Sequence, residues 1–198
     1  GIRAKVATRD EIVSWASKLL CGNDLDGRKI LVIGGRSEEP IDNMRIITNR
    51  STGLMSVSLA KRAFERGAEV ELWMGASSVD VPEYIKTKRF ESVADLVKLV
   101  PRINHEIVIV PAALSDFAPT KMFKGKIPSD ESFKSDFAPV PKVLPLIREK
   151  CDNVIGFKAE SGLTDEQLIE RARLRLNDYG LKAVVANDID AAGKSSST

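Results

Sequence analysis

The chain of 198 residues is poor in several residue types that mark particular classes of protein. It has two cysteines, Cys21 and Cys151, far apart and without a CxxC spacing, and one histidine, His105. This argues against a disulfide framework and a zinc site, and it suits a reducing cytoplasm. No apolar run approaches the ~18 residues of a membrane span. No Ser-His-Asp or Cys-His arrangement can be proposed, and His105, in a polar turn, is expected at the surface.

The chain also lacks a strong excess of charge. Its net charge is +2, with 43% hydrophobic and 29% charged residues, which fits a soluble globular protein of one α/β domain or at most two small ones. A net charge this small creates no overall electrostatic field that would attract nucleic acid or a membrane. The start has no apolar signal core, and both ends resemble those of a trimmed chain.

What the sequence does contain is a regular alternation of strand and helix patterns. Strands are predicted at 29–33, 69–74, 85–90, 106–110, 153–157 and 182–186, and helices at 8–20, 51–66, 93–100, 140–150 and 164–178. Capping residues support three of these helices: Thr8 with Glu11, Ser92, and Thr164 with Gln167. The alternation predicts an α/β fold with a mostly parallel sheet between two helical layers, and ligands beyond the carboxyl ends of its strands.

The first helix carries one apolar face. The residues of that face are Ile12, Val13, Ala16, Leu19 and Leu20.

The stretch 29–60 is the most informative. An apolar run ends in Gly34-Gly35, and after a polar loop Asn49-Arg50-Ser51-Thr52-Gly53 opens the next helix. Free N–H groups at a helix N-terminus beside a glycine turn bind phosphate well. The competing interpretation is an ordinary helix cap, in which Ser51 or Asn49 accepts from the first N–H groups.

Two other nucleotide motifs are disfavoured. No GxGxxG follows the first strand, and the second ends in Trp73-Met74-Gly75 without an acid for a ribose, so an NAD or FAD site is not expected. Gly193-Lys194-Ser195 resembles the end of a P-loop but lacks the upstream glycine, and a solvated tail is the favoured interpretation.

The loop 111–139 is long enough to act as a lid. Asp116 in it either contacts a ligand or caps a turn, and the basic residues Lys124 and Lys126 are either solvated or placed over a phosphate.

The motifs GGRSEEPID, ITNRSTG, AALSDF, KGKIPS, IGFKAE and VANDI stand in an order that closely resembles phosphopantothenoylcysteine synthetase, the ligase family of coenzyme A biosynthesis. The resemblance covers about residues 28–190 and is archaeal-like. It implies a connector at 1–27 and a Rossmann-like, three-layer ligase domain at 28–198 whose C-terminal part is truncated. Family members are commonly fused to a flavin-dependent decarboxylase half, so no flavin is expected in this chain.

The resemblance also implies the chemistry. A nucleoside triphosphate, CTP or ATP, with Mg²⁺ converts the carboxylate of 4′-phosphopantothenate to an acyl-nucleotidate, and cysteine then forms the amide. The enzymes are cytoplasmic homodimers. A non-catalytic nucleotide or phosphate-ester binding domain is the alternative.

Site residues follow by matching motifs. Asn49 and Lys126 match catalytic positions, and Asn49, Ala112, Ala113 and Asp116 match the pantothenate side. The nucleotide side matches Gly34, Gly35, Ser51, Gly53, Val110, Pro111, Ala112, Asp116, Lys126, Pro141, Lys142, Val143, Leu144, Phe157, Arg175 and Asn187.

The chain departs from the bacterial pattern near the phosphate corner. Leu54 stands where lysine is usual, Ser56 where glycine is usual, and Ser37-Glu38 where Thr-Arg is usual.

Overall fold

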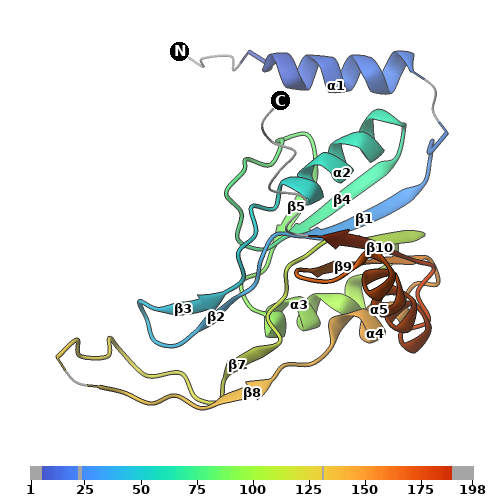
Figure 1. The fold of residues 1–198 in the computed structure, drawn as a ribbon. Helices are drawn as coiled ribbons and strands as arrows, with labels where there is room; N and C mark the ends of the chain where they lie inside the picture. The colour runs from blue at the N-terminus through green and yellow to red at the C-terminus, as the bar shows by residue number, and fades with distance from the viewer. Residues whose placement is uncertain (1–5, 22–23, 131, 189–198) are drawn as a thin grey trace, which may run out of the picture.

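The computed structural model describes residues 6–21, 24–130 and 132–188. Its centre is a six-stranded sheet in the order β10-β9-β6-β1-β4-β5, in which every neighbouring pair is parallel (Figure 1). Its strands are β1 (Lys29–Gly34), β4 (Glu69–Met74), β5 (Lys86–Arg89), β6 (Ile107–Val110), β9 (Val154–Glu160) and β10 (Ala183–Asp188). The predicted fold class, α/β with helices on both faces, is confirmed.

The sheet forms where the sequence is most continuously apolar. All of β1 except Lys29 is buried, and Trp73 and Met74 of β4 are fully covered. Strands covered on both faces need no alternation of polar and apolar residues, and β1 accordingly reads as an unbroken apolar run after Lys29. β1 therefore becomes the central strand, between β4 and β6.

Two helical layers cover the two faces. On one face, α2 (Leu54–Glu65) packs Val57, Ala60 and Ala63 against β1 and β4. On the other face lie α3 (Val93–Leu99), the 3₁₀ turn η1 (Val100–Arg102), α4 (Val143–Arg148) and α5 (Asp165–Asp178). The three predicted capping pairs or caps, at Thr8, Ser92 and Thr164, all form. In the described ranges no helix is long and apolar enough to cross a membrane.

The first helix, α1 (Arg9–Leu20), lies outside these layers and packs on α2 (Figure 1). Its buried residue is Ser14, whereas most of the predicted apolar face is exposed to solvent. The periodicity located an apolar face correctly, but this face does not join the core.

Two helices are shorter than predicted, and each difference has a local cause. The helix expected at 51–66 begins only after Gly53, whose φ of 80° lies outside the helical region. The helix expected at 140–150 is Val143–Arg148, because the Val140 N–H bonds to the Asp116 carbonyl and Pro141 disfavours a helical residue before it.

Two short antiparallel pairs were not predicted. β2 (Glu38–Pro40) pairs with β3 (Ile46–Thr48), and β7 (Phe117–Pro119) pairs with β8 (Phe137–Pro139). Figure 1 shows both pairs projecting together from the sheet, and β2 contacts β7. We call residues 38–48 and 117–139, as far as they are described, the arm; it incorporates the long loop that the sequence presented as a lid.

The expectation that His105 lies at the surface is wrong. Its side chain is only 8% exposed and its Nδ1 is buried without a hydrogen-bond partner. Burial lowers the pKa of His105, and nearby Glu71 partly opposes this. Its position before β6 places it at the amino edge of the sheet, away from the strand ends where ligands bind.

Glu71 is the buried charge at this edge. Lys86 Nζ and Lys88 Nζ lie 2.9 and 2.7 Å from its carboxylate, and Trp73 Nε1 donates to it at 2.7 Å. Burial alone would raise the pKa of Glu71, but the hydrogen bonds from Lys86, Lys88 and Trp73 outweigh burial and lower this pKa from 4.5 to about 2. The carboxylate is thus held ionised by three donors from β4 and β5.

A pH titration of stability tests this cluster. Because the folded-state pKa lies below the unfolded value, Glu71 stabilises the fold above about pH 4.5, and this contribution is lost as the pH falls toward 2. Glu71→Gln should lower the free energy of unfolding at pH 7 by about 1.5–3 kcal/mol and flatten the decline between pH 4.5 and 2. Urea unfolding at several pH values measures both effects. Glu69→Gln, an exposed change on the same strand, is the control, and equal behaviour of the two variants would contradict the assignment.

Candidate functional site

The candidate site lies between β1 and β6, where the order in which the chain adds strands to the sheet reverses. The chain leaves β1 toward β4 on one side, whereas β6, on the other side of β1, continues to β9. In open parallel sheets this switch point opens a crevice at the carboxyl ends of the two central strands. Gly34, Gly35, Val110, Pro111 and Ala112, all predicted nucleotide contacts, lie at these two strand ends.

Backbone hydrogen bonds join the two strand ends. Ala113 N–H donates to the Gly35 carbonyl at 2.8 Å, and Ser37 N–H donates to the Ala113 carbonyl at 3.2 Å. Next to these bonds, the buried Ser37 Oγ accepts a hydrogen bond from Ser115 N–H at 2.9 Å and lies 3.2 Å from Ser115 Oγ. The predicted glycine turn and the AALSDF turn are therefore one continuous structure.

Asn49 reaches the same place from the loop before α2. Its Nδ2 donates to the Ala113 carbonyl at 3.2 Å, and the residue is exposed. The structure thus brings together Asn49 and Ala113, two residues predicted for the pantothenate side, although they are far apart in the sequence. An exposed amide held by one hydrogen bond keeps its carbonyl oxygen available to a ligand.

The N-terminus of α2 opens onto this crevice. Gly53 is its N-cap, with a left-handed backbone and no side-chain capping bond; Thr52 Oγ1 accepts from Leu54 N–H at 3.3 Å. The interpretation in which Ser51 or Asn49 caps the helix is wrong. Ser56 N–H donates to the Gly53 carbonyl at 3.1 Å, so among the described residues Met55 N–H is the first-turn donor left for a phosphate oxygen.

Two glycines fit this corner closely. A Cβ at residue 34 would lie 2.0 Å from Ser56 Oγ, and one at residue 53 would lie 2.5 Å from Met74 Cε. Ser56 is 1% exposed, so it fills the space beside Gly34.

Arg36 is a site residue that the sequence analysis missed. Its guanidinium donates to the Ser51 carbonyl at 2.9 Å and lies 3.5 Å from both Ser78 Oγ and a Glu38 carboxylate oxygen. Only 23% of the side chain is exposed. Arg36 places a positive charge beside the N-terminus of α2. In the sequence, the feature that could have pointed to Arg36 is its position directly after Gly34-Gly35.

Asp116 and Lys142 join two further groups of predicted residues. Lys142 Nζ lies 2.5 Å from Asp116 Oδ1, and the Val140 N–H donates to the Asp116 carbonyl at 3.0 Å. The end of β6 and the start of α4 are thereby held together. Val143 is buried in the core, so only its backbone is available to a ligand; Leu144 is half-buried against the same core, and Pro141 is exposed.

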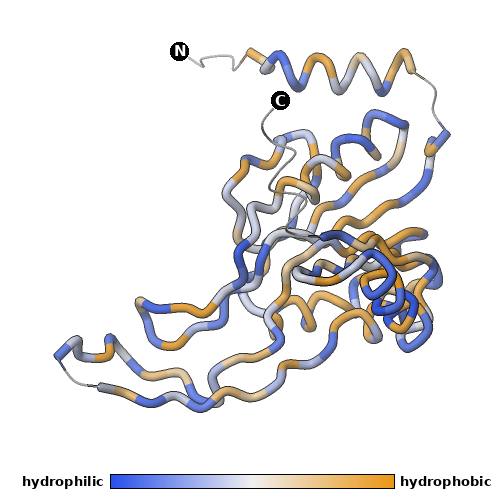
Figure 2. Tube along the Cα trace, viewed as in Figure 1, coloured by the Kyte–Doolittle hydropathy of each residue, from blue (hydrophilic) through white to orange (hydrophobic). Residues whose placement is uncertain are grey.

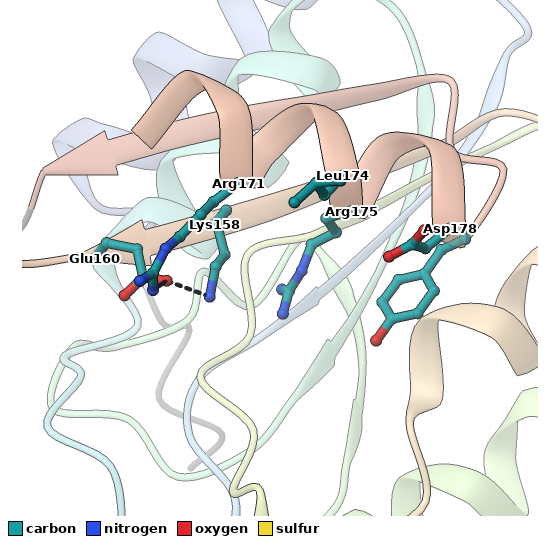
Figure 3. A pocket seen from close by; sticks show the side chains of 7 residues that line it. Lys158, Glu160, Arg171, Leu174, Arg175 and Asp178 are labelled. Carbon is teal, nitrogen blue, oxygen red and sulfur yellow. Dashed lines mark hydrogen bonds and ion pairs between the residues drawn. The ribbon is translucent and has the colours of Figure 1, made fainter. Parts of the chain in front are cut away.

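A second basic region lies along β9 and α5. Arg175 donates to the Phe157 carbonyl at 3.2 Å, which brings these two predicted residues together. Figure 3 shows Arg175 beside Lys158 and Arg171, and Lys158 and Arg171 lie 2.7 and 2.9 Å from Glu160. These side chains line an open cavity of about 240 Å³ together with Leu174, Asp178 and Tyr179.

Lys158 and Arg171 were missed by sequence reasoning. Two sequence features could have pointed to them. Lys158 directly follows Phe157, and Arg171 lies four residues before Arg175, which places both arginines on one helix face. The pair of cations lowers the pKa of Glu160, so its carboxylate is ionised and partly offsets them. Asn187 of β10 stands opposite Ala159 of β9, at the same edge of the sheet.

Lys126 is not brought to the switch point. It is exposed on the arm, and in the described parts of the chain no hydrogen bond or ion pair joins it to Gly34, Asn49 or Gly53. Its neighbour Ile127 donates from its backbone N–H to Asp42 Oδ2 at 2.9 Å.

Asp42 is the anchor of this part of the arm. Besides Ile127 N–H it accepts from Met44 N–H and Arg45 N–H, each at 2.7 Å, and Arg45 Nη1 lies 2.5 Å from Oδ2. The hydrogen bond from Ile127, with help from the others and against burial, lowers the pKa of Asp42 to about 2. The Lys126 segment is therefore bound to the turn between β2 and β3.

Two points remain, the metal ligands and the segment that resembles the end of a P-loop. Across the described ranges, no group of three or more His, Cys, Asp or Glu side chains is placed to hold a metal ion. The Gly193-Lys194-Ser195 segment lies outside the described residues.

Comparisons with known proteins show the family of the chain. Residues 25–198 match the model of the DNA/pantothenate metabolism flavoprotein C-terminal domain. The coenzyme A biosynthesis bifunctional protein CoaBC of Thermococcus kodakarensis is 36% identical over 96% of this chain and 49% of its own length. The CoaBC of Methanocaldococcus jannaschii is 35% identical over 94% of this chain and 47% of its own length. The chain thus spans about half the length of these curated relatives.

Solved structures give the same result for the fold. The C-terminal domain of a CoaBC protein superposes with a TM-score of 0.71 at 29% identity, covering 84% of this chain and 80% of that one. A Cab2 mutant in complex with phosphopantothenate-cysteine superposes at 0.68 with 18% identity, covering 96% and 82%, and supports the fold alone. The motifs pointed to the same family, and the chain belongs to the family of the DNA/pantothenate metabolism flavoprotein C-terminal domain.

Proposed function

We propose that this chain is a phosphopantothenate–cysteine ligase, which uses a nucleoside triphosphate to couple 4′-phosphopantothenate to cysteine. One observation carries the proposal: the glycine corner after β1, the N-terminus of α2 that lacks a side-chain cap, and Asn49 on the Ala113 carbonyl meet at one switch point. The names of the CoaBC relatives and of the matched pantothenate-metabolism domain support the substrate class.

The proposed reaction has two steps. A free carboxylate is a poor electrophile, so its oxygen attacks the α-phosphorus of the nucleotide, which forms an acyl-nucleotidate and releases pyrophosphate. The amine of cysteine then attacks the acyl carbon, loses a proton and expels the nucleoside monophosphate. The protein's contribution is to position the groups and to stabilise developing charge with fixed donors.

Under this proposal the predicted residues contact three parts of the substrates: the phosphates, the acyl group and the nucleoside. Gly34, Gly35, Ser51 and Gly53 approach the phosphates, with Arg36 adding positive charge beside them. Asn49 orients the acyl carbonyl without adding charge, next to Ala112, Ala113 and Asp116. The nucleotide's base and sugar extend along the sheet edge toward α4, Phe157, Arg175 and Asn187. We expect Mg²⁺ to enter on the triphosphate oxygens, as is usual in nucleotide sites. CTP is the expected nucleotide, with ATP as the other candidate.

We infer that the protein functions as a homodimer through the arm. The arm exposes several large apolar side chains for its size, which is typical of an interface. They are Met44, Ile46, Phe117, Met122, Phe133 and Phe137. We also expect a flavin-dependent decarboxylase half in the longer polypeptide, as the length and the name of the bifunctional relatives suggest.

Mass spectrometry of a reaction mixture tests the proposal. With phosphopantothenate, cysteine, Mg²⁺ and CTP or ATP, the chain should form phosphopantothenoylcysteine only when the nucleotide is present. Triphosphate binding by calorimetry without turnover would favour the non-catalytic binding domain instead.

Gly53→Ala should close the phosphate corner. Its Cβ would meet Met74 Cε at 2.5 Å, and a left-handed alanine costs about 1–2 kcal/mol. The matched control is Gly162→Ala, because Gly162 has φ of 69° and nothing within 4 Å of its Cβ position. Chemical denaturation should show the greater loss for Gly53→Ala, and calorimetry should show weakened nucleotide binding in this variant alone. Wild-type nucleotide affinity in Gly53→Ala would remove this corner from the site.

Asn49→Asp should separate the two steps. A carboxylate in place of the amide repels the developing oxyanion, so cysteine transfer should slow by about 10²–10³ while activation is less affected. The acyl-nucleotidate should then accumulate in quenched samples. Asn104→Asp, an exposed change before β6, should behave like the wild type. If Asn49→Asp slows both steps equally, Asn49 does not orient the acyl group in the second step.

We expect the arm, or a second copy, to bring Lys126 to the nucleotide during activation. Lys126→Gln should then slow the first step, by about 10²-fold in pyrophosphate release, because a positive charge near the leaving group is lost. Lys124→Gln is the control, because Lys124 is also an exposed lysine and lies two residues away. Unchanged pyrophosphate release in Lys126→Gln would leave this lysine without a role in activation.

A further inference from the structure

Helix α1 turns an apolar stripe toward solvent. The stripe consists of Ile12, Val13, Ala16, Leu19 and Leu20, and four of its side chains are among the exposed large apolar residues, at 57%, 52%, 74% and 84% for Ile12, Val13, Leu19 and Leu20. Figure 2 shows α1 at the outside of the molecule, with apolar positions along its length. An amphipathic helix on a globular protein normally turns such a face inward.

The opposite side of α1 is fixed to the domain by specific contacts. Ser14 Oγ donates to Glu65 at 3.1 Å and accepts from the Tyr84 hydroxyl at 2.9 Å. Lys18 Nζ donates to the carbonyls of Gly67 and Ala68 at 3.1 and 2.9 Å, just after α2 ends.

An ion pair and a ring contact complete this attachment. Lys61 pairs with Asp10 at 2.6 Å, and Trp15 packs edge-on against Phe64 with ring centroids 4.9 Å apart. These contacts come from the first turn, the middle and the last turn of the helix. They define which face of α1 meets α2, so the apolar stripe stays outward while they hold.

Packing on α2 leaves α1 only weakly covered. Ser14 is its one buried residue, and isolated helices of about 12 residues are marginal in water. Exposed apolar side chains gathered on one helix face mark a surface that another structure covers.

The position of α1 in the chain indicates what covers it. The matched domain model begins at residue 25, so α1 precedes the family's C-terminal domain. The bifunctional relatives are about twice the length of the region they share with this chain. A helix at this position lies between the two halves of such a protein.

A second copy of this chain is the less suitable occupant. The larger group of exposed apolar residues is on the arm, and Figure 1 shows α1 and the arm at opposite ends of the molecule. A two-fold dimer uses one patch from each copy, so a dimer formed through the arm leaves the α1 stripe uncovered.

We propose that the stripe Ile12, Val13, Ala16, Leu19 and Leu20 is the docking surface for the folded half that precedes this domain in the longer polypeptide. The proposal rests on the second half expected under the proposed function. In this arrangement α1 is a rigid two-sided connector: its polar side binds α2, and its apolar side binds the preceding half. The ligase site is then held at a fixed orientation to that half, with no free linker between them.

Hydrogen exchange read by mass spectrometry tests the proposal, on this chain alone and on the longer polypeptide from the same gene. Peptides covering residues 9–20 should exchange at least about tenfold more slowly in the longer polypeptide, because a covered helix opens less often. Leu19→Glu with Leu20→Glu should abolish the difference. Ile169→Glu, an apolar residue of α5 that is 48% exposed, is the control and should keep it.

Three results would overturn the proposal: equal exchange of residues 9–20 in both polypeptides, protection in the short chain that rises with its concentration, or a gene that encodes no preceding half. Concentration-dependent protection would assign the stripe to a second copy. Ligase turnover is measured separately on the short chain. The Leu19 and Leu20 side chains lie outside the proposed site, so their variants should turn over normally, and a failed ligase assay leaves the exchange result unaffected.

Discussion

The structure depends on the junction between the ends of β1 and β6. Peptide and hydroxyl groups of four residues, Gly35, Ser37, Ala113 and Ser115, hydrogen-bond to one another there, and the two serines are buried. Buried polar groups without partners are costly, so this junction has one well-defined arrangement. Two other site groups are placed close to it: Asn49 bonds to Ala113, and Arg36 holds the loop before α2.

Arg36 gives a physical reading of the departures from the bacterial pattern. The resemblance to the bacterial pattern implies positive charges near Glu38 and at Leu54, where this chain has none. Arg36 supplies a positive charge beside the N-terminus of α2, and Glu38 lies 3.5 Å from it.

The arm is organised by a different interaction, the buried carboxylate of Asp42. Backbone N–H groups from both the β2–β3 turn and the Lys126 segment converge on it. The two parts of the arm are far apart in sequence, yet the carboxylate makes them one unit. If Lys126 moves toward a nucleotide bound to its own chain, the β2–β3 pair therefore moves with it. Otherwise Lys126 acts on a nucleotide bound to another copy.

The sheet could be predicted from sequence because its strands are long and buried. β1 and β6 read as apolar runs. The helix caps at Thr8 and Thr164 have recognisable capping partners three residues later, and Ser92 directly precedes an apolar helix pattern. The strands of the arm could not be predicted, because three-residue strands that are largely exposed carry no periodic signal. Burial of His105 and exposure of the α1 stripe also escaped prediction, since both depend on neighbours distant in sequence.

Site residues divide in the same way. Local motifs contain the glycine corner and Asn49, and the family resemblance placed Arg175 on α5 without a motif. Sequence reasoning missed Arg36, Lys158 and Arg171, whose charges acquire meaning only when separate strands and helices bring them to one edge. Motifs therefore located the backbone of the site better than its electrostatics.

The contact between Gly34 and Ser56 has a consequence for how this corner can vary. Two positions share a space that admits one side chain, since a methyl group at residue 34 would overlap the serine hydroxyl. With glycine at residue 56 that volume would be vacant. A mutational library that enlarges residue 34 will yield folded members only where residue 56 shrinks to glycine, and those members will have a looser first turn in α2.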